Sequence, residues 1–122
     1  MVELAVVLPV VLTVLLGCID FGLGISAKLQ VANAVREGAR LSAVSWAGAD
    51  GDAQVVRRVQ QGLGAVVHAR LAAPQLSFPG GRVAGQPVRV AVTCAYDFFL
   101  PVPALVGVKQ LNCGAAATMR LE

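Results

Sequence analysis

The sequence predicts an α+β protein with a long N-terminal helix, first transmembrane and then amphipathic, a second helix, and a small antiparallel β-sheet of two to four strands. Three observations lead to this fold class. The 24 residues between Glu3 and Lys28 carry one charge, that of Asp20. No proline interrupts residues 10–73, where apolar side chains recur at helical spacing. After residue 86, two segments alternate apolar and polar side chains, as strands with one covered face do.

The first segment is long and apolar enough to cross a bilayer, for which about 20 residues suffice. A cleavable secretory signal is the alternative, but it has a basic start and a shorter apolar core of roughly 7–15 residues. No Lys or Arg precedes this run, so an uncleaved anchor is favoured. We therefore expect residues 1–27 to form the transmembrane half of the long helix. Residues 28–122 are expected to form a head that includes the amphipathic half.

Two residues of the span are unusual in lipid. Pro9 removes a helix hydrogen bond, and a charge such as that of Asp20 costs roughly 2.5–3.5 kcal/mol at the bilayer centre. Pro9 lies near the start of the span, where neighbouring helices can cover the exposed carbonyl. Asp20 lies about 24 Å beyond Leu4 along the helix axis, close to the far interface. We expect its carboxylate to reach headgroups and water there.

The helical pattern continues past the span to about Trp46, and the stretch 47–52 ends it. The expected apolar face comprises Ile25, Leu29, Ala32, Val35, Ala39, Ser42 and Trp46. Trp46 is expected to hold the long helix on the head. A second amphipathic helix is expected over residues 52–71, where two glycines weaken its end and Pro74 stops it.

The remainder of the chain is expected to be β-structure. Strands are predicted over residues 87–97 and 109–122, with a shorter edge strand at 75–78. The apolar connector 98–108 is predicted to be a packed loop or a short helix.

Cys94 and Cys113 fall on the inward faces of the two long strands. If they lie opposite each other, residue 92 pairs with 115 and residue 88 with 119. A disulfide is then geometrically possible and would stabilise the fold by about 3 kcal/mol in the chain-entropy model. Two small buried residues are the alternative. A disulfide would place the head outside the cytoplasm.

The sequence offers no catalytic site, metal site or cofactor site. It has none of the spacings of a phosphate-binding loop, a zinc protease or a calcium loop. His68, the chain's one histidine, is expected to be a surface or boundary residue. All 10 Lys and Arg residues lie from Lys28 onward. Of the seven acidic residues, Glu3 and Asp20 precede Lys28, so basic residues outnumber acidic ones in the head, which is mildly basic. This charge permits nucleic-acid binding without indicating it.

Small residues are spaced by four along one face of the span. These are Cys18, Gly22 and Ser26. Small residues at this spacing let membrane helices approach closely, although they are common in membrane helices in general. The row indicates that the functional surface of this helix is a contact with another helix.

The start of the chain resembles the TadE/TadG-like minor pilins, or pseudopilins, of the tight-adherence (Tad/Flp) pilus and secretion system. The resemblance lies in ELAVVLPVVLTVLLGCIDFG and in VANAVREGAR at residues 31–40, and the ending AATMRLE is also similar. The first stretch matches a family pattern of a glutamate, a Leu-Pro step, an aliphatic run and an acidic-Phe-Gly element. The second matches a family box, in which Arg36, Glu37, Gly38 and Arg40 correspond. The middle of the chain is generic.

The resemblance implies a type IV pilin-like architecture with a small extracytoplasmic head on a single-pass helix in the bacterial cytoplasmic membrane. The implied partners are other pilin or pseudopilin subunits, contacted through the N-terminal helix, and an inner-membrane assembly platform. A prepilin peptidase is a further partner if a basic leader precedes Met1. Such a leader would also reverse the orientation that the positive-inside rule gives from Lys28, Arg36 and Arg40 alone. Glu3 corresponds to the family glutamate that offsets a neighbour's N-terminal ammonium, and an ordinary interfacial glutamate is the alternative.

The resemblance therefore implies a non-enzymatic structural subunit, a minor pilin or pseudopilin that serves adherence or secretion and that a surface pilus can incorporate. The alternative is a binding module displayed on a pilus, with the basic head recognising nucleic acid or a surface ligand. Salt dependence of such binding would separate the two, because phosphate contacts weaken steeply as salt rises.

Overall fold

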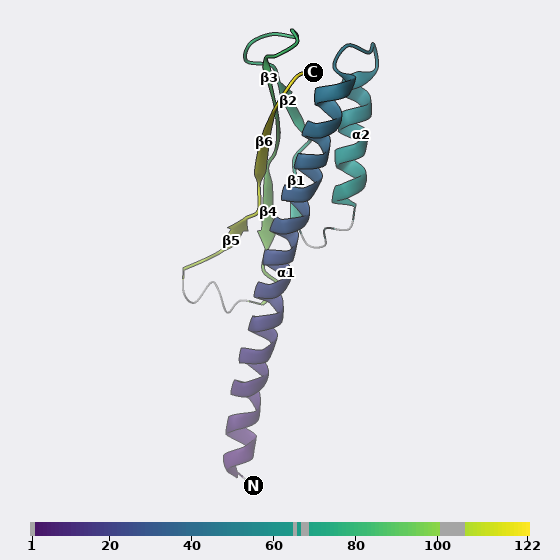
Figure 1. Cartoon of the computed structure of the whole chain (residues 1–122). Helices are drawn as coiled ribbons and strands as arrows, with labels where there is room; N and C mark the ends of the chain where they lie inside the picture. Colours follow the sequence, from purple (N-terminus) through teal and green to yellow (C-terminus); the bar gives the residue numbers. More distant parts are fainter. Residues whose placement is uncertain (1, 65, 67–68, 101–106) are drawn as a thin grey trace.

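The computed structural model describes residues 2–64, 66, 69–100 and 107–122. These residues contain two helices, α1 (Val2–Ser45) and α2 (Gly51–Leu63), and six short strands. The strands are β1 (Ala69–Leu71), β2 (Gln75–Ser77), β3 (Pro87–Val92), β4 (Cys94–Asp97), β5 (Gln110–Asn112) and β6 (Ala115–Arg120). One long helix, a second helix and small antiparallel sheets make the α+β layout that the sequence predicts (Figure 1).

The helix α1 is the longest element and contacts both α2 and the strands. Its N-terminal part extends beyond the head, whereas its C-terminal part lies between α2 and the strands (Figure 1). The predicted end near Trp46 agrees with the observed end at Ser45. Thr13 Oγ1 donates a hydrogen bond of 2.7 Å to the carbonyl of Pro9, and the helix continues through this proline.

The second helix is shorter than predicted. It ends at Leu63, and residues 69–71, which were expected to be helical, form strand β1. Gly62 and Gly64 lower the helix propensity at this end. Strand β1 pairs antiparallel with β4, so the backbone groups of Leu71 and its neighbours form their hydrogen bonds in a sheet and not in a helix. This expectation was wrong because a tertiary contact overrode local periodicity.

The strands form two antiparallel sheets of three, ordered β1-β4-β5 and β2-β3-β6. The predicted register holds, with Val88 opposite Met119 and Val92 opposite Ala115. Each of the two long predicted strands is interrupted, one at Thr93 and the other between β5 and β6, so that each contributes to both sheets. The predicted edge strand is β2, which pairs with β3 only. Of the predicted connector 98–108, residues 101–106 lie outside the described part of the chain.

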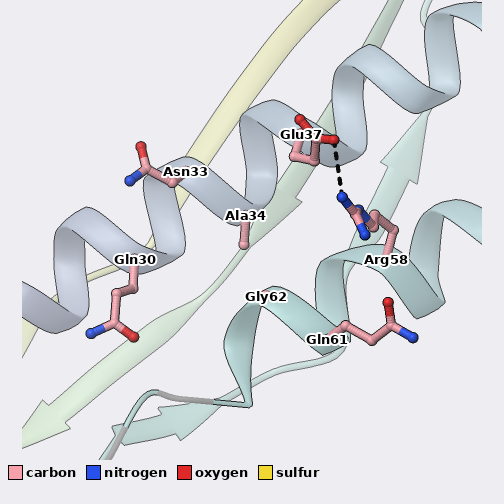
Figure 2. Close-up of a pocket in the computed structure, with 7 residues that line it drawn as sticks. All are labelled: Gln30, Asn33, Ala34, Glu37, Arg58, Gln61 and Gly62. Carbon is pink, nitrogen blue, oxygen red and sulfur yellow. Dashed lines mark hydrogen bonds and ion pairs between the residues drawn. The ribbon is translucent and has the colours of Figure 1, made fainter.

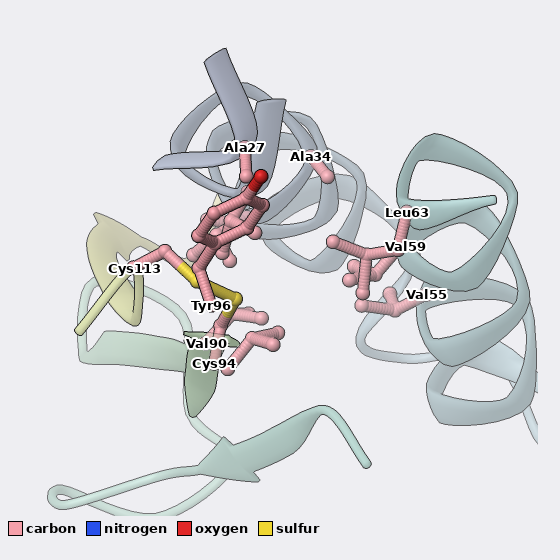
Figure 3. Close-up of a cluster of buried hydrophobic side chains, with 13 residues drawn as sticks. Ala27, Ala34, Val55, Val59, Leu63, Val90, Cys94, Tyr96 and Cys113 are labelled. Carbon is pink, nitrogen blue, oxygen red and sulfur yellow. A yellow bond between two sulfur atoms is a disulfide. The ribbon is translucent and has the colours of Figure 1, made fainter. Parts of the chain in front are cut away.

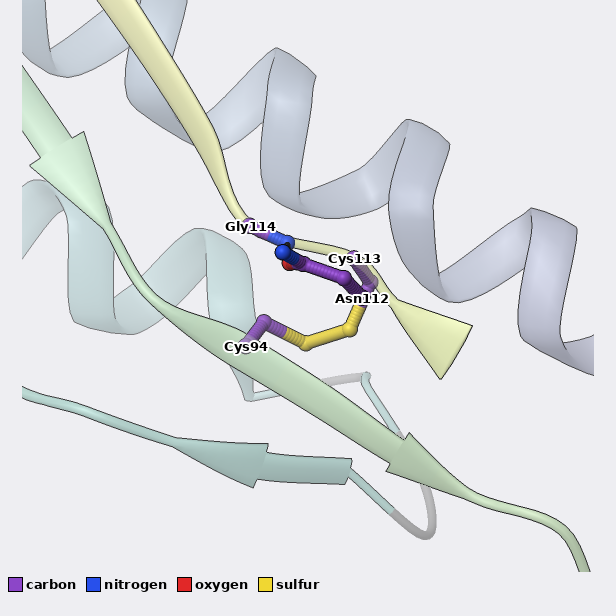
Figure 4. The surroundings of a disulfide bond; sticks show 4 residues. All are labelled: Cys94, Asn112, Cys113 and Gly114. Carbon is purple, nitrogen blue, oxygen red and sulfur yellow. Dashed lines mark hydrogen bonds between the residues drawn. A yellow bond between two sulfur atoms is a disulfide. The ribbon is translucent and has the colours of Figure 1, made fainter. Parts of the chain in front are cut away.

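A disulfide joins Cys94 and Cys113 at these interruptions (Figure 4). The two Cα atoms are 4.9 Å apart, and the Cys113 N–H donates to the Cys94 carbonyl at 3.0 Å. Gly114 N–H donates to Asn112 Oδ1 at 2.9 Å and shapes the turn between β5 and β6. The disulfide therefore fastens the two chain segments at the point where both pass from one sheet to the other.

The hydrophobic core lies where α1, α2 and the sheets meet (Figure 3). Val31 and Val35 of α1 and Val59 of α2 are fully buried, as are the disulfide and the inward side chains of β3 and β4. The C-terminal residue is bonded to the end of α1. Trp46 Nε1 donates to the carbonyl of Glu122 at 2.8 Å, so Trp46 does hold the end of α1 on the head.

Candidate functional site

Residues 2–19 of α1 are uncovered by the rest of the chain. An 18-residue window of this helix has a mean hydropathy of 2.6, and none of the window is buried. Val2, Leu4 and Ile19 are each more than 60% exposed. Glu3 is exposed in the first helical turn, where its negative charge interacts favourably with the positive end of the helix dipole. This segment is long and apolar enough to cross a membrane.

The uncovered segment ends at Asp20, which is buried against the head. Asp20 is only 4% exposed, and its carboxylate accepts two hydrogen bonds from residues of the head. The Tyr96 hydroxyl donates to Oδ1 at 3.0 Å, and the Leu100 N–H donates to Oδ2 at 3.1 Å. Both carboxylate oxygens thus have partners from a segment about 80 residues away, which ties the head to the end of the apolar helix.

Tyr96, which contacts this carboxylate, belongs to an aromatic cluster. Phe21 stacks on Phe98 with ring centroids 5.9 Å apart, and Tyr96 meets Phe98 edge-on at 5.6 Å. Such pairs contribute roughly 0.5–1.5 kcal/mol beyond their burial. The consecutive residues Asp20 and Phe21 therefore both bind the head, the first through hydrogen bonds and the second through ring packing.

The expectation that Asp20 reaches headgroups and water was wrong. It rested on the position of Asp20 along an isolated helix, and the structure places a tyrosine of β4 directly against it. The sequence held one usable signal: Tyr96 is the last inward-facing residue of a predicted strand, and a buried hydroxyl requires a partner. Nothing in the sequence pairs that hydroxyl with Asp20 in particular.

The environment of Tyr96 also alters its acidity. The side chain is 1% exposed. Burial raises the pKa of Tyr96 above its ordinary value of 10.0, and the hydrogen bond to Asp20 and the charge of that carboxylate raise it further. Tyr96 therefore stays a hydrogen-bond donor throughout the neutral range.

The head packs against a face of α1 made mostly of small residues. Ile25 and Leu29, expected on the buried face, are 48% and 61% exposed. Gly24, Ala27 and Val31 are buried in their place. A Cβ on Gly24 would lie 3.0 Å from Leu111 and 3.3 Å from Tyr96, so the strands approach too closely for larger side chains. The predicted apolar face was wrong in this part because close backbone approach, not hydrophobicity, selects the buried side.

The two helices also meet through glycines. A Cβ on Gly38 of α1 would collide with Val59 of α2, and a Cβ on Gly62 of α2 would lie 2.9 Å from Ala34. Gly38 is the buried member of the family box. Arg36, Glu37 and Arg40 of that box are exposed.

A groove of about 430 Å³ runs between α1 and α2 beside the box (Figure 2). Glu37 and Arg58 form an ion pair of 3.4 Å across it, and both side chains are about half exposed. Such an exposed pair contributes only about 0–1 kcal/mol. The groove otherwise presents the side-chain amides of Gln30, Asn33 and Gln61.

The row of small residues predicted in the span faces away from the head. Cys18, Gly22 and Ser26 are all exposed, and a Cβ on Gly22 would meet no atom within 4 Å. Cys18 is a free thiol. The Ser26 hydroxyl accepts a hydrogen bond from Gln30 on the same helix. This row is therefore a surface on which another helix fits without obstruction from the chain itself.

The described residues contain no group of three or more His, Cys, Asp or Glu side chains that is arranged to hold a metal ion. His68 lies outside the residues that the structure describes. Within the described part, Arg58, Arg70 and Arg82 pair with Glu37, Asp97 and Asp52, respectively.

Comparison with known proteins bears on the N-terminal segment. The family model described as TadE-like protein matches residues 1–40, which contain the apolar helix, the Asp20–Phe21 pair and the family box. No curated protein and no solved structure matches the chain. The resemblance read from the sequence is thus confirmed over these 40 residues, which are similar to the TadE-like family.

Proposed function

We propose that the protein is a membrane-anchored minor pilin or pseudopilin, a non-enzymatic structural subunit of a Tad-type pilus or secretion apparatus. The observation that carries this proposal is the uncovered part of α1. Its residues 2–19 are mostly apolar and exposed, and at 1.5 Å per residue they extend about 27 Å, close to the thickness of a bilayer core. A surface of this kind requires lipid or other helices to cover it.

We place the membrane boundary near Asp20, somewhat before the expected division at residue 27. The head already contacts α1 at Asp20, Gly24 and Ala27. In this arrangement the second half of α1 supports the extracytoplasmic head of a single-pass protein in the bacterial cytoplasmic membrane. The Cys94–Cys113 disulfide supports this orientation, because disulfides persist in oxidising compartments.

Assembly would proceed through the outward face of α1. The exposed row of Cys18, Gly22 and Ser26 offers close approach to the helix of another pilin or pseudopilin subunit. The inner-membrane assembly platform is the further partner, together with a prepilin peptidase if a leader precedes the sequence. Glu3, exposed at the start of the helix, is available to a neighbour's N-terminal ammonium.

Oxidative cross-linking of membranes tests this face. We expect an oxidant to join two chains through Cys18, because the thiol is exposed on the proposed contact face. Gly22→Leu should abolish the cross-link by holding the helices apart. The matched control carries Cys18→Ser and Leu16→Cys, which moves the thiol to the side that faces the head. Equal cross-linking of the control, or persistence in Gly22→Leu, would contradict helix association through this row.

Fractionation of the host bacterium tests the anchoring and orientation. The chain should remain in the membrane pellet after alkaline extraction, and protease added outside the cytoplasmic membrane should degrade the head. Release by alkali would refute the anchor. A head that is cleaved only after the membrane is broken would refute the orientation.

A further inference from the structure

A pocket of about 270 Å³ opens where the uncovered helix meets the head. On the α1 side it is lined by Leu16, Ile19 and Leu23, and on the head side by Phe99 and Leu100. Its polar groups belong to the Asp20–Tyr96 pair. The pocket is therefore a mostly apolar cavity at the level where the proposed span ends.

One wall of this pocket is continuous with the surface that the proposed anchor presents to lipid. Leu16 and Ile19 are 49% and 61% exposed and belong to the uncovered segment 2–19. The opposite wall is equally apolar, and Phe99 is 80% exposed. A phenylalanine this exposed, beside a membrane-spanning helix, is typical of a residue that enters the membrane interface.

The polar groups at this point are already satisfied within the chain. The Leu100 N–H and the Tyr96 hydroxyl both donate to the carboxylate of Asp20. In lipid, an unpaired backbone group is unfavourable because no water is present to replace the bond. The buried carboxylate thus supplies the Leu100 N–H with a partner that does not depend on water.

We propose that Phe99 and Leu100 enter the outer edge of the bilayer and that the pocket between them and α1 receives a lipid acyl chain. This inference rests on the proposed membrane anchoring. Lipid is the occupant because one wall of the pocket is the span itself, whose surroundings in a membrane are acyl chains. The head is then held to the membrane at two points, the span and the segment 98–100.

Depth-dependent fluorescence quenching tests this proposal in the full chain reconstituted in phosphatidylcholine vesicles. Trp46→Phe removes the chain's one tryptophan, and Phe99→Trp then introduces a single probe beside the pocket. The control is Val83→Trp in the same background, since Val83 is 59% exposed in the loop between β2 and β3, at the end of the head farthest from the N-terminus (Figure 1). Leu8→Trp reports separately on the span. Circular dichroism checks that each variant keeps its fold.

We expect lipids brominated on their acyl chains to quench the Phe99→Trp and Leu8→Trp chains, and aqueous iodide to quench the Val83→Trp chain alone. Quenching of Phe99→Trp by iodide but not by brominated lipid would overturn the inference. Protection from both quenchers would also overturn it, because a second protein chain would then cover the site. If Leu8→Trp is quenched by brominated lipid in either case, the anchor stands and only the inference fails. Failure of Leu8→Trp itself would refute the anchoring.

Discussion

Removal of the Tyr96 hydroxyl should destabilise the attachment of the head to α1. Tyr96→Phe deletes the donor that lies 3.0 Å from Asp20 Oδ1 and leaves the ring in place. Asp20 is 4% exposed, so water is poorly placed to replace the bond, although the Leu100 N–H still serves Oδ2. An unsatisfied buried acceptor costs about 1–3 kcal/mol. We therefore expect the free energy of unfolding to fall by this amount.

The assay is urea unfolding of the full chain in detergent micelles, followed by the fluorescence of Trp46. This residue is the chain's one tryptophan, and its indole donates to Glu122 at the other end of the head, so its emission reports undocking of the head. With a slope of about 2 kcal/mol per molar urea, the loss corresponds to a midpoint lower by about 0.5–1.5 M.

A double-mutant cycle decides whether the loss belongs to this hydrogen bond. In the Asp20→Ala background the acceptor is absent, so Tyr96→Phe should have little further effect. The coupling energy should then be about 1 kcal/mol or more. If Tyr96→Phe costs the same in both backgrounds, the carboxylate and the hydroxyl do not stabilise each other, and the interpretation of Asp20 as the attachment point is refuted.

Three further outcomes are expected. Gly38→Ala should lower the free energy of unfolding by about 1–3 kcal/mol, because the methyl group would collide with a valine of α2. Gly22→Ala should leave the free energy of unfolding nearly unchanged, because no atom lies within 4 Å of the new Cβ. Equal losses for Gly38→Ala and Gly22→Ala in urea unfolding would contradict close packing of α1 and α2. Replacing both Cys94 and Cys113 by alanine should lower the free energy of unfolding by about 3 kcal/mol. In the chain that keeps all its cysteines, thiol labelling after unfolding without reductant should count one free thiol, and a count of three would eliminate the disulfide. Tyr96, the chain's one tyrosine, should ionise above pH 10 in an ultraviolet absorbance titration of the folded chain. Because its folded pKa is raised, its contribution to the free energy of unfolding is complete below pH 10 and is lost as pH rises through the folded pKa. A titration midpoint at or below pH 10 would contradict the buried hydroxyl donor.

Much of the candidate site could be predicted from local patterns. The apolar run before Asp20 and the absence of proline from residues 10–73 suffice to predict one long helix, because helix length and lipid crossing depend on consecutive residues alone. The alternation in 87–97 and 109–122 predicts both the inward faces and the pairing of residue 88 with 119. Here each strand's period of two fixes which side chains face inward, and one assumed cysteine pair fixes the register.

The buried side of α1 was not predictable in the same way. A hydrophobicity pattern selects Ile25 and Leu29, yet the head packs on Gly24 and Ala27. The reason is steric: at Gly24 a strand side chain, and at Gly38 a valine of α2, comes so close to the helix that a larger side chain would not fit at those two positions. The larger residues are then left outside, where lipid or another subunit is available to cover them.

By itself, the sequence determined that the chain has an apolar N-terminal helix, a small α+β head and TadE-like character in its first 40 residues. The tertiary structure alone decided what Asp20 does. Its partners Tyr96 and Leu100 lie 76 and 80 residues away, and a pattern within one helix carries no information about contacts at that separation. A carboxylate near the end of an apolar helix is costly in isolation, and it becomes stabilising only because the folded head brings two donors to it.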